Sequence, residues 1–375
     1  MTMGTDSTVT FQNSSADQVL TSDGEAFYNL TINKTGGTGV DDIEPTDNVD
    51  VNGTLTLTDG ELDLNVNNVD LNIGGDFVQA SAASFDNDGQ TVTFDGTEQN
   101  MTTAATGPGS NNGTADFDNF TVASGAEVTL LTEELEVDGT LTIQSGGKLF
   151  LNGQEYDNNG TLSNEGALIL DGDENIGTWK MDTDSGVTIY KGNGTGAQTT
   201  HTMQTRSGSD YYDLTINDTS ASNRDTFEWP SGQDLDVEGS INVLSGTLDV
   251  ETNTRDIQLV GSWVFGSGGN LSVGTQTITF EGTGDQMITW SGKSMYDVVL
   301  NNTGASGSDD ITFIDDGRID NNITITDGDL DLATNDVSFN LWGNWVMGGS
   351  GSLDASDGAV VFASTNQPVW LAVGV

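Results

Sequence analysis

The residues of this sequence best suited to binding a ligand are aspartates that follow glycine-rich turns. Residues 36–44 read Gly-Gly-Thr-Gly-Val-Asp-Asp-Ile-Glu and match the nonapeptide Gly-Gly-x-Gly-x-Asp-x-apolar-x. Parallel β-rolls use that nonapeptide to bind Ca²⁺, a hard cation that prefers oxygen ligands. Related segments begin at Ser220 and Gly304. The candidate calcium ligands of the three segments are Asp41, Asp42, Asp225, Asp309 and Asp310.

Two interpretations of these aspartates remain open. Calcium sites of the β-roll type need tandem nonapeptides, whereas each segment here stands alone. The simpler interpretation is a glycine turn closed by an Asx hydrogen bond from the aspartate. We therefore expect that no cofactor is required, and weak binding of Ca²⁺ or other cations is the alternative.

Catalytic groups are scarce in this chain. His201 is the single histidine and there is no cysteine, so a histidine- or thiolate-based metal site would be incomplete. We expect His201 to be an ordinary surface residue. A glycosidase needs only two carboxylates at a set separation, but the sequence nominates no pair among its 58 acidic residues. The expectation is that the protein is not an enzyme, with polysaccharide degradation as an alternative.

The charge of the chain restricts its surroundings and its partners. There are 58 Asp and Glu residues against 9 Lys and Arg, a net charge of -49. Repulsion among so many like charges opposes compaction unless molar salt shortens the Debye length to about 3 Å. The acids are dispersed among regular apolar positions, which argues against a disordered acidic tail. We expect a halophilic setting, no nucleic-acid partner, since no basic patch exists, and no membrane span, since no apolar stretch reaches about 20 residues.

A repeated unit must position these side chains. The pattern Tyr-Asn-Leu-Thr-Ile-Asn at residues 28–33 recurs at 119–122, 212–217 and 296–301, so that its copies lie 84 to 94 residues apart. A second element, Val-Asn-Gly-Thr-Leu-Thr-Leu at residues 51–57, follows each copy. The units that we predict are a partial repeat at 1–26 and repeats at 27–116, 117–210 (divergent), 211–295 and 296–375.

Each element alternates apolar and polar residues, which is the period of a half-buried strand. Asn-Gly, Asp-Gly and Ser-Gly turns separate the strands, and no window shows helical spacing. We predict an all-β fold, a parallel β-helix (β-solenoid) over residues 9 to 362, in which each coil packs on its neighbours. Tandem β-sandwiches, one per repeat, are the alternative.

Aromatic residues recur at fixed phases of the unit. One row contains Phe11, Phe94, Phe280 and Phe362, and a second contains Phe77, Trp263 and Trp345. We expect both rows to fill the interior of the coils; a strip that stacks against sugars is the other interpretation. Trp229 lies outside these rows, so we expect it to be exposed.

The repeat resembles the right-handed β-helix repeats of large microbial surface proteins, adhesins, and viral tail fibres or spikes. The resemblance covers nearly the whole chain and rests on Tyr-Asn-Leu-Thr-Ile-Asn, Val-Asn-Gly-Thr-Leu-Thr-Leu and Val-Thr-Phe-x-Gly. It implies a non-catalytic stalk or attachment protein. The leading expectation is an extracellular virion-surface protein (spike, turret or tail fibre) of a virus that infects a halophile. A segment of a cell-surface adhesin is the alternative.

The resemblance also implies which partners the protein has. We expect a homo-oligomer, most plausibly a trimer, that contacts other virion or surface proteins and a host-surface glycan or glycoprotein. The first residues lack the pattern of a signal peptide, which favours assembly inside the cell or a trimmed chain. Residues 368–375 are uncharged and apolar, so we expect them to pack against a partner chain or a further domain.

Overall fold

The regular structure of the chain consists of strands. The computed structural model describes residues 6–12, 15–36, 40–104, 116–158, 160–172, 174, 176, 182, 184–205, 210–220 and 224–363. Those residues contain no helix, and so no helix long and apolar enough to cross a membrane. The expectation for residues 368–375, and the glycines at 37 and 39 of the nonapeptide, fall outside the described residues.

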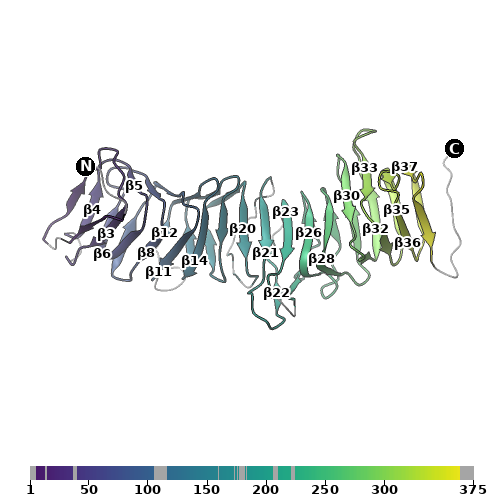
Figure 1. The fold of residues 1–375 in the computed structure, drawn as a ribbon, viewed down its shortest axis with the longest axis horizontal. Coiled ribbons are helices and arrows are strands. Elements are labelled where there is room, and N and C mark those ends of the chain that lie inside the picture. The colour runs from purple at the N-terminus through teal and green to yellow at the C-terminus, as the bar shows by residue number, and fades with distance from the viewer. Residues whose placement is uncertain are drawn as a thin grey trace. The chain divides into compact units, whose positions relative to one another are not determined.

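The chain divides into two compact units, residues 1–186 and 187–375. Within each unit, successive strands stack on strands from the next coil (Figure 1), and the paired strands run parallel. Parallel stacking of this kind requires a crossover after every strand, whereas a β-sandwich is built from antiparallel pairs. The prediction of an all-β parallel β-solenoid is confirmed for both units, and the tandem-sandwich alternative is wrong.

The first unit is built from twenty strands within its described residues. They are β1 (Thr8–Phe11), β2 (Gln18–Leu20), β3 (Asn29–Asn33), β4 (Asp42–Pro45), β5 (Val49–Val51), β6 (Leu55–Asp63), β7 (Leu71–Ile73), β8 (Phe77–Gln79), β9 (Ala83–Asp86), β10 (Thr91–Phe94), β11 (Gln99–Thr103), β12 (Asp116–Phe117), β13 (Asn119–Val122), β14 (Glu127–Thr132), β15 (Leu135–Val137), β16 (Thr140–Ile143), β17 (Lys148–Phe150), β18 (Tyr156–Asn158), β19 (Thr161–Asn164) and β20 (Ala167–Leu170). Four parallel rows result: β1-β3-β6-β8-β11-β14-β17-β20, β2-β4-β6-β9, β5-β7-β10-β13-β16-β19 and β12-β15-β18.

The second unit is built in the same way. Its described strands are β21 (Val187–Tyr190), β22 (Thr200–Thr202), β23 (Asp213–Asn217), β24 (Thr226–Glu228), β25 (Leu235–Val237), β26 (Ile241–Asp249), β27 (Ile257–Leu259), β28 (Trp263–Ser272), β29 (Thr277–Phe280), β30 (Gln286–Thr289), β31 (Ser294–Met295), β32 (Asp297–Asn301), β33 (Asp310–Phe313), β34 (Gly317–Ile319), β35 (Ile323–Asp331), β36 (Ser338–Leu341), β37 (Trp345–Asp354) and β38 (Ala359–Phe362). Two long strands each take part in two rows. Strand β26 pairs with both β23 and β24, and β35 pairs with both β32 and β33.

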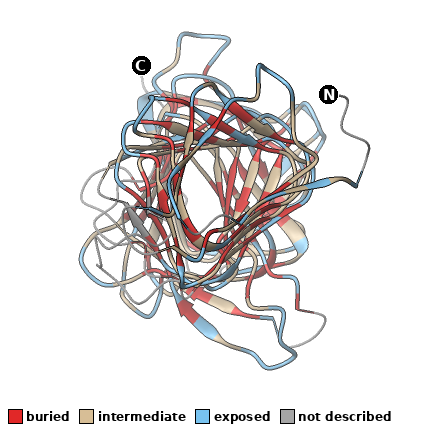
Figure 2. Ribbon diagram, turned by 90° about the vertical axis from the view of Figure 1, so that its left-hand side faces the viewer, coloured by how far each residue is buried: buried red, intermediate tan, exposed pale blue. Residues whose placement is uncertain are grey.

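The alternation of the sequence decides which side chains form the core. In β3, Leu30 and Ile32 are fully buried while their neighbours are partly exposed. Leu55 pairs with Leu30 and with Phe77, so like positions stack along the coils and exclude water together. Figure 2 shows the result: buried residues line the inside of the coils, and exposed residues lie on the turns.

Most residues of the aromatic rows lie inside the coils, as predicted, but Phe11 is only partly buried. Phe77, Phe94, Trp263 and Phe280 are fully buried, whereas Phe362 in β38 is 40% exposed. The expectation for Trp229 is wrong. Its ring is fully buried, and its Nε1 donates to the carbonyl oxygen of Gln233 at 3.1 Å, because the residue continues the inward phase of Phe227 in β24.

A bulge with a glycine recurs in three nine-residue strands, β6, β26 and β35. The register shifts where each strand leaves its partner, and Gly60, Gly246 and Gly328 have φ values of 84°, 93° and 89°. A Cβ at Gly60 would lie 2.7 Å from the carbonyl oxygen of Asp41 and 2.8 Å from Cβ of Lys34. Both the left-handed backbone and the close approach therefore require glycine.

We expect Gly60→Ala to destabilise the first unit more than Gly89→Ala. Gly89 has a φ of 81° but no atom within 4 Å of a Cβ, so its variant loses only about 1 kcal/mol to backbone strain. Gly60→Ala adds the backbone clash, and we expect a further loss of about 1–3 kcal/mol. Urea unfolding in molar KCl measures both, and equal midpoints would contradict the role assigned to the bulge.

Candidate functional site

The five predicted aspartates occupy two adjacent positions at the start of equivalent strands. Asp41, Asp225 and Asp309 precede a short strand, and their carbonyl oxygens accept backbone N–H bonds at 3.1, 3.0 and 3.1 Å from the next coil. Asp42 and Asp310 are the first residues of β4 and β33. The backbone is thus the same in the three copies, and the side chains around it differ.

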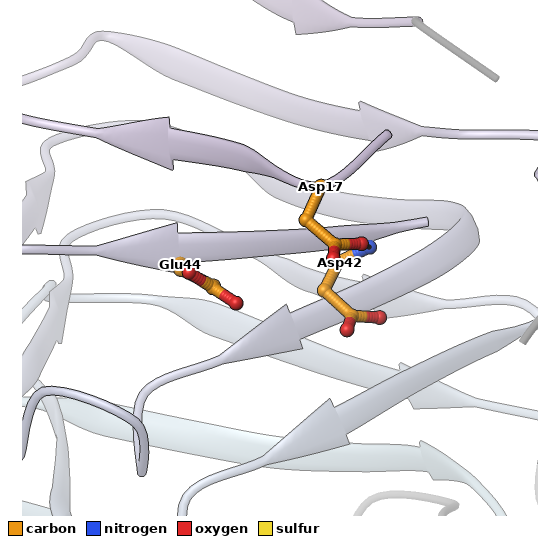
Figure 3. Close-up of side chains that lie close together, drawn as sticks. All are labelled: Asp17, Asp42 and Glu44. Carbon is orange, nitrogen blue, oxygen red and sulfur yellow. Dashed lines mark hydrogen bonds between the residues drawn. The ribbon is translucent and has the colours of Figure 1, made fainter. Parts of the chain in front are cut away.

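In the first unit, Asp42 belongs to a row of acids that crosses several coils, which we call the N-terminal acidic ladder. Its members are Asp17, Asp42, Glu44, Glu61, Asp63 and Asp86. Parallel pairing places Asp42 beside Glu61, and Asp63 beside Asp86. The Asp42 backbone N–H donates to Oδ1 of Asp17 at 3.3 Å. Figure 3 shows Asp17 and Asp42 next to each other, with Glu44 further along the same strand as Asp42.

The second unit repeats this arrangement in the C-terminal acidic ladder. Its members are Asp285, Asp309, Asp310, Asp329, Asp331 and Asp354. Asp310 pairs with Asp329 in neighbouring strands, and Asp331 pairs with Asp354. The Asp310 N–H donates to Oδ1 of Asp285 at 3.3 Å, as in the first ladder. None of these residues forms an ion pair with a basic side chain of the described part of the chain.

Crowding of carboxylates changes their proton affinity. Burial, followed by the charges of Asp42, Asp63 and Asp86, raises the pKa of Glu61 to about 7. Burial and the charges of Asp17 and Asp41 also raise the pKa of Asp42. In the C-terminal acidic ladder, burial and then Asp285 raise the pKa of Asp310.

Two groups of oxygen atoms in the ladders are close enough to share one cation. Carboxylate oxygens of Asp17, Asp42 and Glu44 lie within 4.8 Å of one another, and the same holds for Asp309, Asp310 and Asp329. An all-oxygen set of this kind suits a hard cation such as Ca²⁺. Asp17, Glu44 and Asp329 were missing from the residues predicted from sequence, since they come from neighbouring coils and strand positions. Only the alternation of acids along each strand hinted at them.

We expect Glu61→Gln to remove a fall in stability between about pH 4.5 and 7. The pKa of Glu61 rises from 4.5 to about 7 on folding, so the folded state binds its proton more tightly. Its contribution is fully present below pH 4.5 and is lost as the pH rises through 7. This difference corresponds to about 3 kcal/mol, which falls to about 1–2 kcal/mol because the group is only half-buried and salt screens it.

Urea unfolding in molar KCl across this pH range measures the slope. Glu25→Gln, which removes an exposed glutamate outside the ladder, is the control and should leave the slope as it is in the unmodified protein. If Glu61→Gln also leaves it unchanged, Glu61 does not hold a proton at neutral pH.

Asp225 lies in a different environment, a buried polar cluster of the second unit. Its Oδ2 lies 3.2 Å from Nε2 of His201, and its Oδ1 accepts the Thr199 N–H at 2.7 Å. Asp218 accepts the Asp225 N–H at 2.7 Å. His201 and Asp225 are fully buried, and the imidazole stacks on Phe227 with the ring centroids 5.2 Å apart.

The expectation that His201 lies on the surface is therefore wrong. In β22 the two threonines point outward and His201 points inward, which is the alternation that the sequence already contained. Asp225 and Phe227 make the interior suitable for an imidazole, because Asp225 provides a hydrogen-bond partner and Phe227 a ring on which it stacks. The cluster provides partners for Nε2 of His201 and for the N–H of Asp225, and its histidine faces the core.

Comparison with known proteins gives no relative. No protein-family model, no curated protein and no solved structure matches the chain.

Proposed function

We propose that this protein is a non-catalytic structural and attachment protein on the surface of a virion that infects a halophilic host. The acidic ladders are the observation that carries the proposal: both units are β-solenoids with rows of carboxylates that no basic side chain of the described residues neutralises. Such rows repel one another in dilute solution and are tolerated where salt is concentrated. A stack of short coils also suits a spacer, since each coil needs only its neighbours.

The proposal includes homo-oligomerisation, with a trimer as the expected state. Exposed sheet edges favour association, and closed symmetry covers them. Light scattering in molar KCl measures the mass of the particle. A monomer at all protein concentrations would contradict the trimer and would leave attachment to be carried by single chains.

Location is the test of the proposed function. We expect antibodies against the folded protein to label purified virions in electron micrographs taken at high salt. Labelling of cell envelopes alone would instead identify a cell-surface adhesin or stalk. Labelling of neither would contradict an extracellular role.

A further inference from the structure

A groove on the outside of the first unit has the composition of a carbohydrate site. It crosses β11, β14 and β17 and has a volume of about 290 Å³. Its lining residues are Glu98, Gln99, Asn100, Glu127, Thr129 and Phe150. The volume lies just below the range of about 300–1,000 Å³ that is usual for small-ligand sites, which suits one or two sugar rings better than a long chain.

Strand register brings the lining side chains together. Asn100 pairs with Thr129, and Thr129 pairs with Phe150. These three positions alternate with the buried residues Met101, Val128 and Leu149, so their side chains point outward in one row across three coils. Phe150 thereby places an aromatic ring, only partly buried, on a hydrophilic outer face.

The polar groups beside the ring differ in how far they are already occupied. Gln99 is buried, and its Nε2 donates to the carbonyl oxygens of Ile73 and Gly75 at 2.7 Å each, so it supports the floor of the groove. The Asn100 side chain donates its Nδ2 to Asp76 at 3.3 Å, which leaves its carbonyl oxygen for a ligand. The Thr129 hydroxyl and the exposed Glu98 carboxylate add further groups that can bond to hydroxyls.

Charge narrows the class of ligand. Glu127 pairs with Nζ of Lys148 at 2.5 Å, so that Glu98 is the one unneutralised charge among the lining residues. A second carboxylate brought by an anionic sugar would be repelled, both there and by the acidic chain as a whole. The acidic chain as a whole would attract a cationic peptide, but among the lining residues such a peptide would find Glu98 as the one unpaired carboxylate.

We infer that this groove binds an uncharged hexose unit of a surface glycan, stacked on Phe150 and hydrogen-bonded by Asn100, Thr129 and Glu98. Sugars present an apolar face of C–H groups to an aromatic ring and hydroxyls at their edges, which matches one ring flanked by acceptors and a hydroxyl. The inference rests on the proposed attachment function and gives it a receptor class.

Binding of trisaccharides of glucose, galactose and mannose tests the inference, with saturation-transfer NMR in molar KCl as the readout. We expect at least one of them to bind, about tenfold more weakly to Phe150→Ala, and within about threefold of normal to Phe150→Tyr, which keeps the ring. Phe362→Ala removes a partly exposed ring of the second unit and should leave binding unchanged. Circular dichroism confirms that each variant is folded.

Several results would overturn the inference. They are no binding of any neutral trisaccharide, equal binding by Phe150→Ala, or preference for a uronate-containing trisaccharide or for an oligolysine peptide. The location experiment fails independently of this one. If the protein is found on virions but binds no sugar, the proposed function stands and the sugar site is rejected. If it binds sugar but is absent from both virions and envelopes, the sugar site stands and the proposed function is rejected.

Discussion

In dilute buffer, the protein is expected to melt at a much lower temperature than in molar KCl. Pairs of like charge lie directly opposite one another in parallel strands, as Asp63 does with Asp86 and Asp331 with Asp354. Strands are about 4.8 Å apart, which is within the Debye length of about 10 Å at 0.1 M salt but beyond the length of about 3 Å at 1 M. Screening therefore acts at the spacing that the fold imposes.

The size of the effect follows from the number of such contacts. Each opposed pair costs up to about 1 kcal/mol, and the net charge of -49 adds repulsion between more distant groups. We expect a difference of several kcal/mol between the two conditions. At about 2–4 °C per kcal/mol for units of this size, the midpoint should rise by about 10 °C or more.

Melting curves followed by circular dichroism measure this rise. Asp63→Asn combined with Asp354→Asn, one member of each opposed pair, should raise the midpoint in dilute buffer and leave the midpoint in molar KCl nearly unchanged. CaCl₂ at the same ionic strength as KCl separates screening from ligation, since only ligation by the ladders would give Ca²⁺ an additional effect. Equal midpoints in dilute buffer and in molar KCl would mean that the acidic ladders do not limit stability.

Replacement of Asp225 by alanine is expected to destabilise the second unit by about 3–5 kcal/mol. The change removes both the carboxylate beside His201 and the acceptor of the Thr199 N–H. It leaves an imidazole and a backbone donor buried without those partners, which is the costly way to disrupt a buried polar pair. The expected fall in the melting midpoint in molar KCl is about 10 °C.

Asp309→Ala is the matched control, because Asp309 holds the same position in the following repeat. The Asp309 side chain makes one hydrogen bond in the described structure: its Oδ1 accepts the Gly307 N–H at 2.9 Å. Loss of this bond should cost about 1 kcal/mol. His201→Gln offers a second comparison. Gln286 pairs with Ile311 in the same way as His201 pairs with Phe227, so a glutamine is accommodated at this position of the repeat. His201→Gln should therefore lower the stability less than Asp225→Ala does. Similar losses for Asp225→Ala and Asp309→Ala would refute a special role for the buried pair.

The strands and their inward faces follow from the amino-acid pattern alone. Alternation with a period of two specifies which side of a strand is apolar, whatever the strand packs against. Leu30, Ile32 and Phe94 could therefore be placed in the core, and the recurrence of one unit indicated stacked coils. The same alternation also indicates the inward direction of His201, contrary to the surface position that we expected.

Which functional groups meet depends on how the coils stack. Asp17, Asp42 and Glu61 are brought together by the register between coils, and a shift of one residue would turn a side chain to the opposite face. Loop lengths between short strands set that register, and composition does not reveal it. Phe150 became part of a groove for the same reason.

Equivalent residues acquired different roles through their neighbours. Asp41, Asp225 and Asp309 look alike in sequence, and their backbones make the same bond to the next coil. Asp225 faces a buried histidine, whereas the carboxylate of Asp309 lies close to those of Asp310 and Asp329. The free energy of a carboxylate depends on burial and on charges within a few ångströms, and in a solenoid those charges come from other coils. The repeat thus specified where each aspartate lies, and the stacking of coils specified what it contacts.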